Sequence, residues 1–140
     1  MIRVGIVDDH AIVRTGLRQF LSEQVDLRIS GEAANGREAL ELARGGETDV
    51  MLMDLSMPDQ GGVDALAAIK ARFPDLHVLI LSGFPEAHYA TTLLRQGASG
   101  YINKEADPEE IVKAIRTVAL GRRYITPAVA EMLADGMAAG

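Results

Sequence analysis

The sequence predicts an α/β domain built on a doubly wound, five-stranded parallel sheet with helices on both faces. Short apolar runs alternate with amphipathic helical patterns along the chain, which is typical of repeated strand–helix units. Apolar residues dominate most of these runs, as expected for strands that are buried on both faces. With 140 residues, 48% of them hydrophobic, the chain can form the core of one compact domain.

Five apolar runs predict the strands, and each ends at a polar residue or a turn signal. They are the segments Ile2–Val7, Leu27–Ala33, Asp49–Met53, His77–Leu81 and Gly100–Asn103. Because crossovers between parallel strands are right-handed, few topologies remain. We expect the flavodoxin-like order 2-1-3-4-5, in which the first and third strands lie side by side at the point where such sheets bind ligands.

The first two helices follow from apolar spacing and from a start signal. Val13, Leu17 and Leu21 recur at helical spacing after the first strand. Asn35 followed by Glu38 resembles a capping box, which predicts a second helix that extends to about residue 44.

The next two helices are bounded by proline and glycine. Apolar positions around Ile69 mark the third helix, which must end before Pro74. The fourth helix is predicted to open at Pro85 or Glu86 and to close at Gly97, in the position after the helix where glycine is common.

The fifth helix has the strongest start signal of the chain. Asp107 is predicted to cap it, Pro108 to occupy its first position and Glu110 its third. A shorter amphipathic segment, Thr126–Leu133, follows a turn and predicts one more short helix.

Composition and charge exclude several classes of function for this chain. The formal net charge of −6 repels a phosphate backbone, so direct nucleic-acid binding is not expected. There is no cysteine, and hence no disulfide framework or thiolate chemistry. No signal peptide precedes the first strand, and no apolar stretch approaches the roughly 20 residues that span a bilayer. We therefore expect a cytoplasmic protein that does not contact a membrane.

Polar side chains follow four of the predicted strands, at the point where each strand ends. They are the pair Asp8 and Asp9, then Asp54, Ser82 and Lys104. Because the carboxyl ends of parallel strands meet at one edge of a sheet, we expect these side chains to lie together. Three crowded carboxylates are unfavourable unless a cation joins them. The sequence therefore predicts a divalent metal site and an anionic ligand at this edge.

A magnesium ion suits this set, because hard cations take oxygen ligands from carboxylates, carbonyls and water. Asp9, Asp54 and the backbone carbonyl of Ser56 are the candidate protein ligands. Together with a lysine and a hydroxyl, they form a phosphoryl-transfer site with an aspartyl phosphate as the covalent species. Taken singly, the acids also fit helix caps, the serine a turn and the lysine a surface charge. Three histidines are interpreted as structural or exposed: His10, His77 and His88.

The motifs around these residues resemble the receiver domain of two-component response regulators, over about residues 2–120. The matching stretches are Ile6–His10, Met53–Pro58 with Gly62, Leu81–Gly83 and Gly97–Lys104. The histidine after the acid pair, and the segments Gly97–Tyr101 and Asp107–Ile111, are similar to the NarL/FixJ branch of that family. In that branch the receiver precedes a LuxR-type helix-turn-helix domain.

The resemblance implies a metal and an acceptor role for the acidic residues. Asp54 would be the phosphoacceptor, which takes its phosphoryl group from a sensor histidine kinase. Asp8 and Asp9 would bind Mg²⁺, with Asp54 and the Ser56 carbonyl as further ligands. Apart from its own phosphorylation and dephosphorylation, the domain is expected to have no enzymatic activity.

The resemblance implies a switch for the remaining residues. Ser82 would be the switch hydroxyl, Lys104 the phosphoryl-binding lysine and Tyr101 the switch aromatic, whose ring would turn inward on phosphorylation. Glu105 follows the lysine where many receivers have proline.

The resemblance also divides the chain. Residues 1–121 would form the receiver domain, and residues 122–140 the start of a linker to a helix-turn-helix domain that this chain lacks. Phosphorylation would then control dimerisation of a transcriptional regulator, which would contact DNA only through that domain. The alternative is a stand-alone receiver that acts by protein–protein interaction.

Two other classes of function fit these residues less well. A Mg²⁺-dependent phosphatase similar to the haloacid dehalogenase superfamily would normally carry its nucleophile after the first strand and a second Asp two residues later, where this chain has Ser56. A pure interaction module with a silent site would have lost some of the polar residues, and all of them are present.

Overall fold

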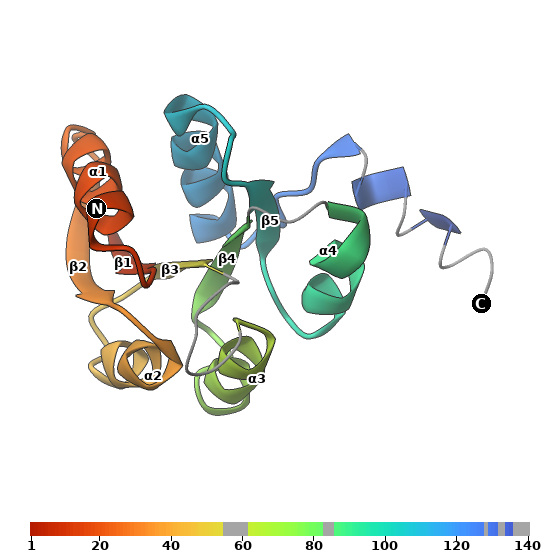
Figure 1. Cartoon of the computed structure of the whole chain (residues 1–140), viewed down its shortest axis with the longest axis horizontal. Helices are drawn as coiled ribbons and strands as arrows, with labels where there is room; N and C mark the ends of the chain where they lie inside the picture. Colours follow the sequence, from red (N-terminus) through yellow and green to blue (C-terminus); the bar gives the residue numbers. More distant parts are fainter. Residues whose placement is uncertain (55–61, 83–85, 128, 132–133, 136–140) are drawn as a thin grey trace.

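The fold follows the predicted class and strand order. The computed structural model describes residues 1–54, 62–82, 86–127, 129–131 and 134–135. Its sheet is parallel and five-stranded, with the order β2-β1-β3-β4-β5 (Figure 1). The strands are β1 (Ile2–Val7), β2 (Leu27–Ala33), β3 (Val50–Asp54), β4 (His77–Ser82) and β5 (Gly100–Asn103). The helices are α1 (Ala11–Ser22), α2 (Gly36–Arg44), α3 (Gly62–Arg72), α4 (Glu86–Arg95) and α5 (Pro108–Ala119).

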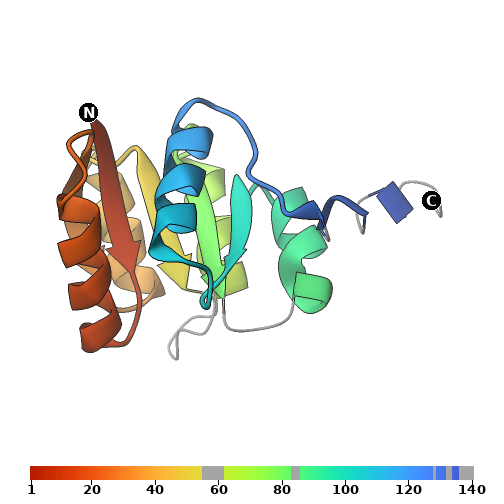
Figure 2. The ribbon, with the colours of Figure 1, turned by 90° about the horizontal axis from the view of Figure 1, so that it is seen from above.

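Two apolar clusters, one on each face of the sheet, form the core. One joins α1 and α5 to the sheet through residues such as Leu21, Ile115 and Val118. The other joins α2, α3 and α4 to the opposite face, with Ile69 and Leu93 among its fully buried members. Figure 2 shows α1 and α5 together in front of the sheet. Each fully buried aliphatic side chain contributes about 1.5–3 kcal/mol to the stability of the fold. The clusters on both faces of the sheet therefore stabilise the domain. None of the described helices is long and apolar enough to cross a membrane.

The register of the strands brings their carboxyl ends to one edge. Val7, the last residue of β1, pairs with Ala33 of β2 and with Met53 of β3. One step further along, Asp54 pairs with Leu81, and Ser82 pairs with Asn103 of β5. The residues predicted to form the site therefore leave the sheet within one or two positions of each other.

The predicted bounds of β3 and β4 are each off by one residue. β3 begins at Val50 rather than Asp49, and it includes Asp54. The Asp49 carboxylate instead binds Arg3, accepting hydrogen bonds from its backbone N at 2.8 Å and from its Nη2 at 2.9 Å. β4 extends by one residue to include Ser82, because the ladder with β5 continues to that point.

The predicted ends of α2 and α4 are confirmed. Asn35 Oδ1 accepts a hydrogen bond from the Glu38 backbone N at 2.9 Å, and the Glu38 side chain accepts one from the Ala34 backbone N. Gly97 has φ +108 after α4. Its N–H bonds the Leu94 carbonyl, and the next N–H, of Ala98, bonds the Leu93 carbonyl. Because this left-handed turn is strained for other residues, glycine is required there.

The start of α5 is only partly as predicted. Pro108 occupies the first turn, but Asp107 makes no side-chain cap hydrogen bond. Its backbone carbonyl instead accepts from the Glu110 N at 2.9 Å. The predicted opening of α4 at Glu86 is confirmed, while Pro85 lies outside the described residues.

The segment after α5 packs back onto the domain. Tyr124 forms an isolated parallel bridge with Gly100 of β5, and its N donates to the Ser99 carbonyl at 2.9 Å. A Cβ on Gly100 would lie 2.7 Å from the Tyr124 carbonyl oxygen, so only glycine permits this approach. Beyond it, Thr126 Oγ1 caps the start of the predicted short helix, and Val129 is fully buried in the cluster that contains Leu93. Met132 and Leu133 lie outside the described residues.

The phenol of Tyr124 provides a spectroscopic test of this packing. Burial raises its pKa to about 12, and the hydrogen bond that it donates to Glu110 Oε1 at 2.8 Å adds to the shift. Tyr124→Phe is expected to remove a phenolate absorbance step near pH 12 that Tyr89→Phe retains. The pKa of Tyr124 in the folded protein lies above its ordinary value of 10.0. The stability that the neutral, hydrogen-bonded phenol gives to the folded state is therefore complete below pH 10 and is lost as the pH rises towards 12. Persistence of that step in Tyr124→Phe would show that the segment does not dock this way.

Candidate metal centre and acceptor site

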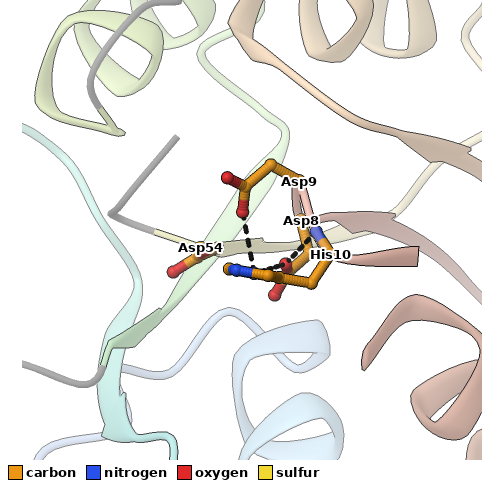
Figure 3. A group of neighbouring side chains, drawn as sticks. All are labelled: Asp8, Asp9, His10 and Asp54. Atoms are coloured by element: carbon orange, nitrogen blue, oxygen red, sulfur yellow. Dashed lines mark hydrogen bonds and ion pairs between the residues drawn. The ribbon is translucent and has the colours of Figure 1, made fainter. Parts of the chain in front are cut away.

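Three carboxylates and one imidazole meet at the carboxyl edge of the sheet. Asp8, Asp9 and His10 come from the loop between β1 and α1, and Asp54 closes β3 (Figure 3). Each offers one oxygen or nitrogen atom, and these atoms all lie within 4.8 Å of one another. The predicted acidic cluster is thus assembled by the fold.

Lys104 joins this cluster from the residue after β5. Its Nζ lies 3.1 Å from Asp54 Oδ1 and 3.5 Å from Asp8 Oδ2. Burial lowers the pKa of Lys104, but the hydrogen bond to Asp54 and the charges of Asp54 and Asp8 outweigh burial and raise the pKa above its ordinary value. The side chain therefore remains an ammonium cation beside the two carboxylates.

The charge balance of the site fits a divalent cation. Asp8 and Asp54 are each only 1% exposed, and a buried carboxylate is costly without a partner. Asp8 Oδ2 receives no hydrogen bond from the described residues, and Lys104 at 3.5 Å is an ion pair rather than a close contact. One ammonium against three carboxylates leaves two negative charges. A hard ion such as Mg²⁺, which prefers carboxylate oxygens, suits this donor set.

The switch residues lie close to the cluster along the sheet. Ser82 closes β4 and is fully buried, and its carbonyl accepts a hydrogen bond from the Lys104 backbone N at 2.8 Å. Tyr101 lies in β5 and is also fully buried. The expected inward turn of Tyr101 would therefore not start from an exposed ring. The predicted carbonyl ligand, Ser56, lies outside the described residues.

His10 is exposed, in agreement with its interpretation as a structural or exposed residue, but its ring also contacts both acids of the loop. Its ring is 59% exposed, yet Nδ1 lies 3.0 Å from Asp8 Oδ1 and 2.9 Å from Asp9 Oδ1. Its position directly after the acid pair was the signal in the sequence. The sequence does not specify the direction of the ring. In the structure the loop turns the ring towards both carboxylates (Figure 3).

Arg14 is a second residue that sequence reasoning missed. From the first turns of α1, its Nη1 donates to the Asp8 backbone carbonyl, and its Nε lies 3.3 Å from Glu32 Oε1 on β2. Glu32 also pairs with Arg18 Nη1 at 2.7 Å. The backbone of the acid loop is therefore held by Arg14, whose guanidinium is itself paired with Glu32. One helical turn separates Arg14 from His10, a spacing that places both near the same end of the helix.

Removing this support is expected to weaken metal binding. Arg14→Ala frees the Asp8 carbonyl, so Asp8 and Asp9 lose part of their fixed orientation. We expect the affinity for Mg²⁺ to fall by about tenfold, as is common when groups that orient metal ligands are lost. Titration calorimetry measures this change. Arg18→Ala is the matched control, since it removes a pair with the same Glu32 without touching Asp8, and an equal loss there would disprove the orienting role.

A cavity of about 470 Å³ lies away from the acidic cluster. It is lined by residues at the start of the strands and by the end of α5, among them Asp49 and His77. Because these residues lie at the amino ends of β3 and β4, the cavity is at the opposite edge of the sheet from Asp54.

Comparison with known proteins identifies the family. The model of the response regulator receiver domain matches residues 4–116, most of the chain and all of the site residues in it. The chain belongs to this receiver domain family. The confirmed strand order and the cluster of Asp8, Asp9, Asp54 and Lys104 agree with that membership.

Relatives of this receiver domain are named response regulators. Response regulator GacA of Pseudomonas aeruginosa is 42% identical over 134 residues, which is 96% of this chain and 63% of GacA. Response regulator UvrY of Escherichia coli is 39% identical over 134 residues, 96% of this chain and 62% of UvrY. The receiver domain thus spans less than two thirds of the length of these relatives.

Solved structures show the same fold. A two-component response regulator of the LuxR family from Aurantimonas superposes with a TM-score of 0.88 at 34% identity, over 97% of each chain. The isolated receiver domain of RcsB from Salmonella enterica serovar Typhimurium, solved with the phosphomimetic BeF₃⁻, superposes with a TM-score of 0.83 at 25% identity, over 93% of this chain and 96% of that one. The NarL/FixJ and LuxR resemblance of the sequence is confirmed by these relatives.

Proposed function

We propose that this receiver domain accepts a phosphoryl group on Asp54 from a sensor histidine kinase and acts as a phosphorylation-dependent switch. The observation that carries the proposal is the placement of Lys104 Nζ between Asp54 and Asp8, 3.1 and 3.5 Å from their oxygens, at a buried edge of the sheet. A cation held beside an acidic nucleophile can neutralise the oxygens of an incoming phosphoryl group.

In the transfer step, an Asp54 carboxylate oxygen attacks phosphorus and forms a P–O bond. The P–N bond to the donor histidine of the kinase breaks, and the leaving imidazole keeps the electron pair and takes up a proton. Asp8, Asp9, Asp54 and the Ser56 carbonyl would hold Mg²⁺, which when bound neutralises charge on the phosphoryl oxygens. Lys104 binds one of these oxygens and remains protonated throughout.

The new phosphate adds up to two negative charges at the carboxyl edge of the sheet. We propose that Ser82 and Lys104 bind it, and that the face of α4, β5 and α5 then repacks around Tyr101. Since Tyr101 is already buried, this change is a rearrangement within the core rather than burial of an exposed ring.

The output of the switch is also a proposal. Residues 1–121 are taken as the receiver and residues 122–140 as the start of a linker, because GacA and UvrY extend well beyond the matched region. Phosphorylation would promote a homodimer in the cytoplasm, and a helix-turn-helix domain outside this chain would bind DNA. Apart from gaining and losing its own phosphoryl group, the domain would turn over no substrate.

The proposal is tested by incubating the protein with acetyl phosphate, a small phosphoryl donor, with and without Mg²⁺. Intact mass spectrometry is expected to show one added phosphoryl group only when Mg²⁺ is present, and hydroxylamine, which cleaves acyl phosphates, should remove it. Peptide mapping should place the group on Asp54. Modification at any other residue, or none with Mg²⁺ present, would contradict the proposal.

A further inference from the structure

We propose that His10 is a ligand of the metal site, and that it gives the site an affinity for divalent ions that accept nitrogen, such as Zn²⁺, that carboxylates alone would not provide. The inference rests on the proposed function only in that the same acidic cluster holds the ion. It assigns a chemical role to a residue outside the acid, lysine and hydroxyl set.

The spacing around the ring nitrogen matches the edge of a coordination shell. His10 Nδ1 lies 2.9 Å from Asp9 Oδ1 and 3.0 Å from Asp8 Oδ1. An octahedral ion with bonds of about 2.1 Å has neighbouring ligand atoms about 3.0 Å apart. The two distances from His10 Nδ1 are therefore those expected between neighbouring ligand atoms of one such ion.

The atoms at this contact are of the kinds that bind metal ions. Two carboxylate oxygens face one imidazole nitrogen, and the lone pair of a neutral imidazole nitrogen can bind a metal ion. Asp8 Oδ2, buried and without a hydrogen bond from the described residues, is a further oxygen donor beside them.

Local structure holds His10 in this position. It is the N-cap residue of α1, where Ser, Thr, Asp and Asn are usual, and its side chain makes no cap hydrogen bond. Its backbone N instead donates to Asp8 Oδ1 at 2.8 Å, and its carbonyl accepts from the Arg14 N at 3.0 Å. The ring is thus tied to the acid loop while more than half of it faces solvent, from which an ion can enter.

An imidazole changes which ions a site prefers. Oxygen-only sites suit Mg²⁺ and Mn²⁺, whereas imidazole nitrogen suits Zn²⁺, Cu²⁺, Fe²⁺ and Ni²⁺. Loss of His10 should therefore weaken binding of the ions that accept nitrogen far more than binding of Mg²⁺.

The test is to titrate wild type and His10→Ala separately with Zn²⁺, Mn²⁺ and Mg²⁺ alone by calorimetry. His10→Ala is expected to lower the Zn²⁺ affinity by about tenfold or more and the Mg²⁺ affinity by less than about threefold. Pulsed EPR of bound Mn²⁺ should show coupling to a histidine ¹⁴N in wild type and none in His10→Ala. His77→Ala, at the opposite edge of the sheet, should change neither readout.

Three results would overturn the inference: an unchanged Zn²⁺ affinity, an equal loss for Zn²⁺ and Mg²⁺, or tighter binding in His10→Ala, which would mean that the ring blocks the site. The first two would show that His10 does not give the site its preference for ions that accept nitrogen, even if Asp54 is phosphorylated normally. Conversely, a failure of phosphorylation with Mg²⁺ would remove the proposed function, while the Zn²⁺ and EPR results would still decide the role of His10.

Discussion

Asp54→Asn is expected to abolish phosphoryl incorporation. The amide has no anionic oxygen with which to attack phosphorus, and the other two carboxylates, Asp8 and Asp9, leave the sheet from the loop after β1 rather than from β3. Labelling from acetyl phosphate with Mg²⁺, measured by intact mass, should therefore fall to the level seen without Mg²⁺. The fold should survive, because the substitution removes one of three crowded negative charges and keeps the shape of the side chain.

Asp64→Asn is the matched control for this experiment. Asp64 is an exposed acid of α3, on the helix that follows the acceptor in the chain. It should take up label at the wild-type rate. Residual Mg²⁺-dependent labelling of Asp54→Asn, with the label mapped to Asp8 or Asp9, would show that the acceptor has been wrongly assigned.

Lys104→Ala is expected to lower the free energy of unfolding by about 2 kcal/mol or more in the absence of divalent metal. The change leaves Asp8 and Asp54 buried without their cation, and removing one partner of a buried ion pair is strongly destabilising. Saturating Mg²⁺ should restore much of the loss, so metal should stabilise the variant more than it stabilises wild type. Urea unfolding with and without Mg²⁺, at constant ionic strength, measures both quantities.

The pH dependence of this pair has a definite sign. Because the folded pKa of Lys104 is raised above its ordinary value of 10.5, the stabilisation is complete below about pH 10.5 and is lost as the pH rises through the folded pKa. Lys113→Ala, an exposed lysine of α5, should leave stability and its Mg²⁺ dependence unchanged. An Mg²⁺ effect of the same size in wild type and Lys104→Ala would mean that lysine and metal do not share the same carboxylates.

The fold was predictable because its signals are local. Apolar runs with turn residues at their ends set the bounds of β1, β2 and β5 correctly, and the Asn35 capping box and the Gly97 turn appeared as expected. The errors have two causes: a contact between residues far apart in the chain, and competition between a side chain and its own backbone for the same N–H group. The Asp49 carboxylate binds Arg3 46 positions earlier in the chain, and the side chain of Asp107 was displaced from its capping role by its own backbone carbonyl.

The site was predictable in its strand-end residues and not in its supporting ones. Asp54 and Lys104 leave neighbouring parts of a parallel sheet, so topology alone brings them to one edge. His10 and Arg14 act through the orientation of a ring and of a guanidinium across a loop. No period or composition encodes such an orientation, and only the positions beside the acid pair pointed to them.

The docking of residue 124 against β5 has a consequence for self-association. An open strand edge offers unpaired N–H and C=O groups to another chain, and proteins usually cover or charge such edges. The β2 edge carries exposed charged residues, Arg28 and Glu32, whereas the β5 edge is covered at Gly100 by Tyr124. A variant ending at Gly121 would bare that edge, and we expect light scattering to show aggregation that neither phosphorylation nor Mg²⁺ alters. An oligomer formed by a domain that ends before Tyr124 would therefore result from the exposed β5 edge, whereas a phosphorylation-dependent oligomer must be sought in a domain that includes Tyr124.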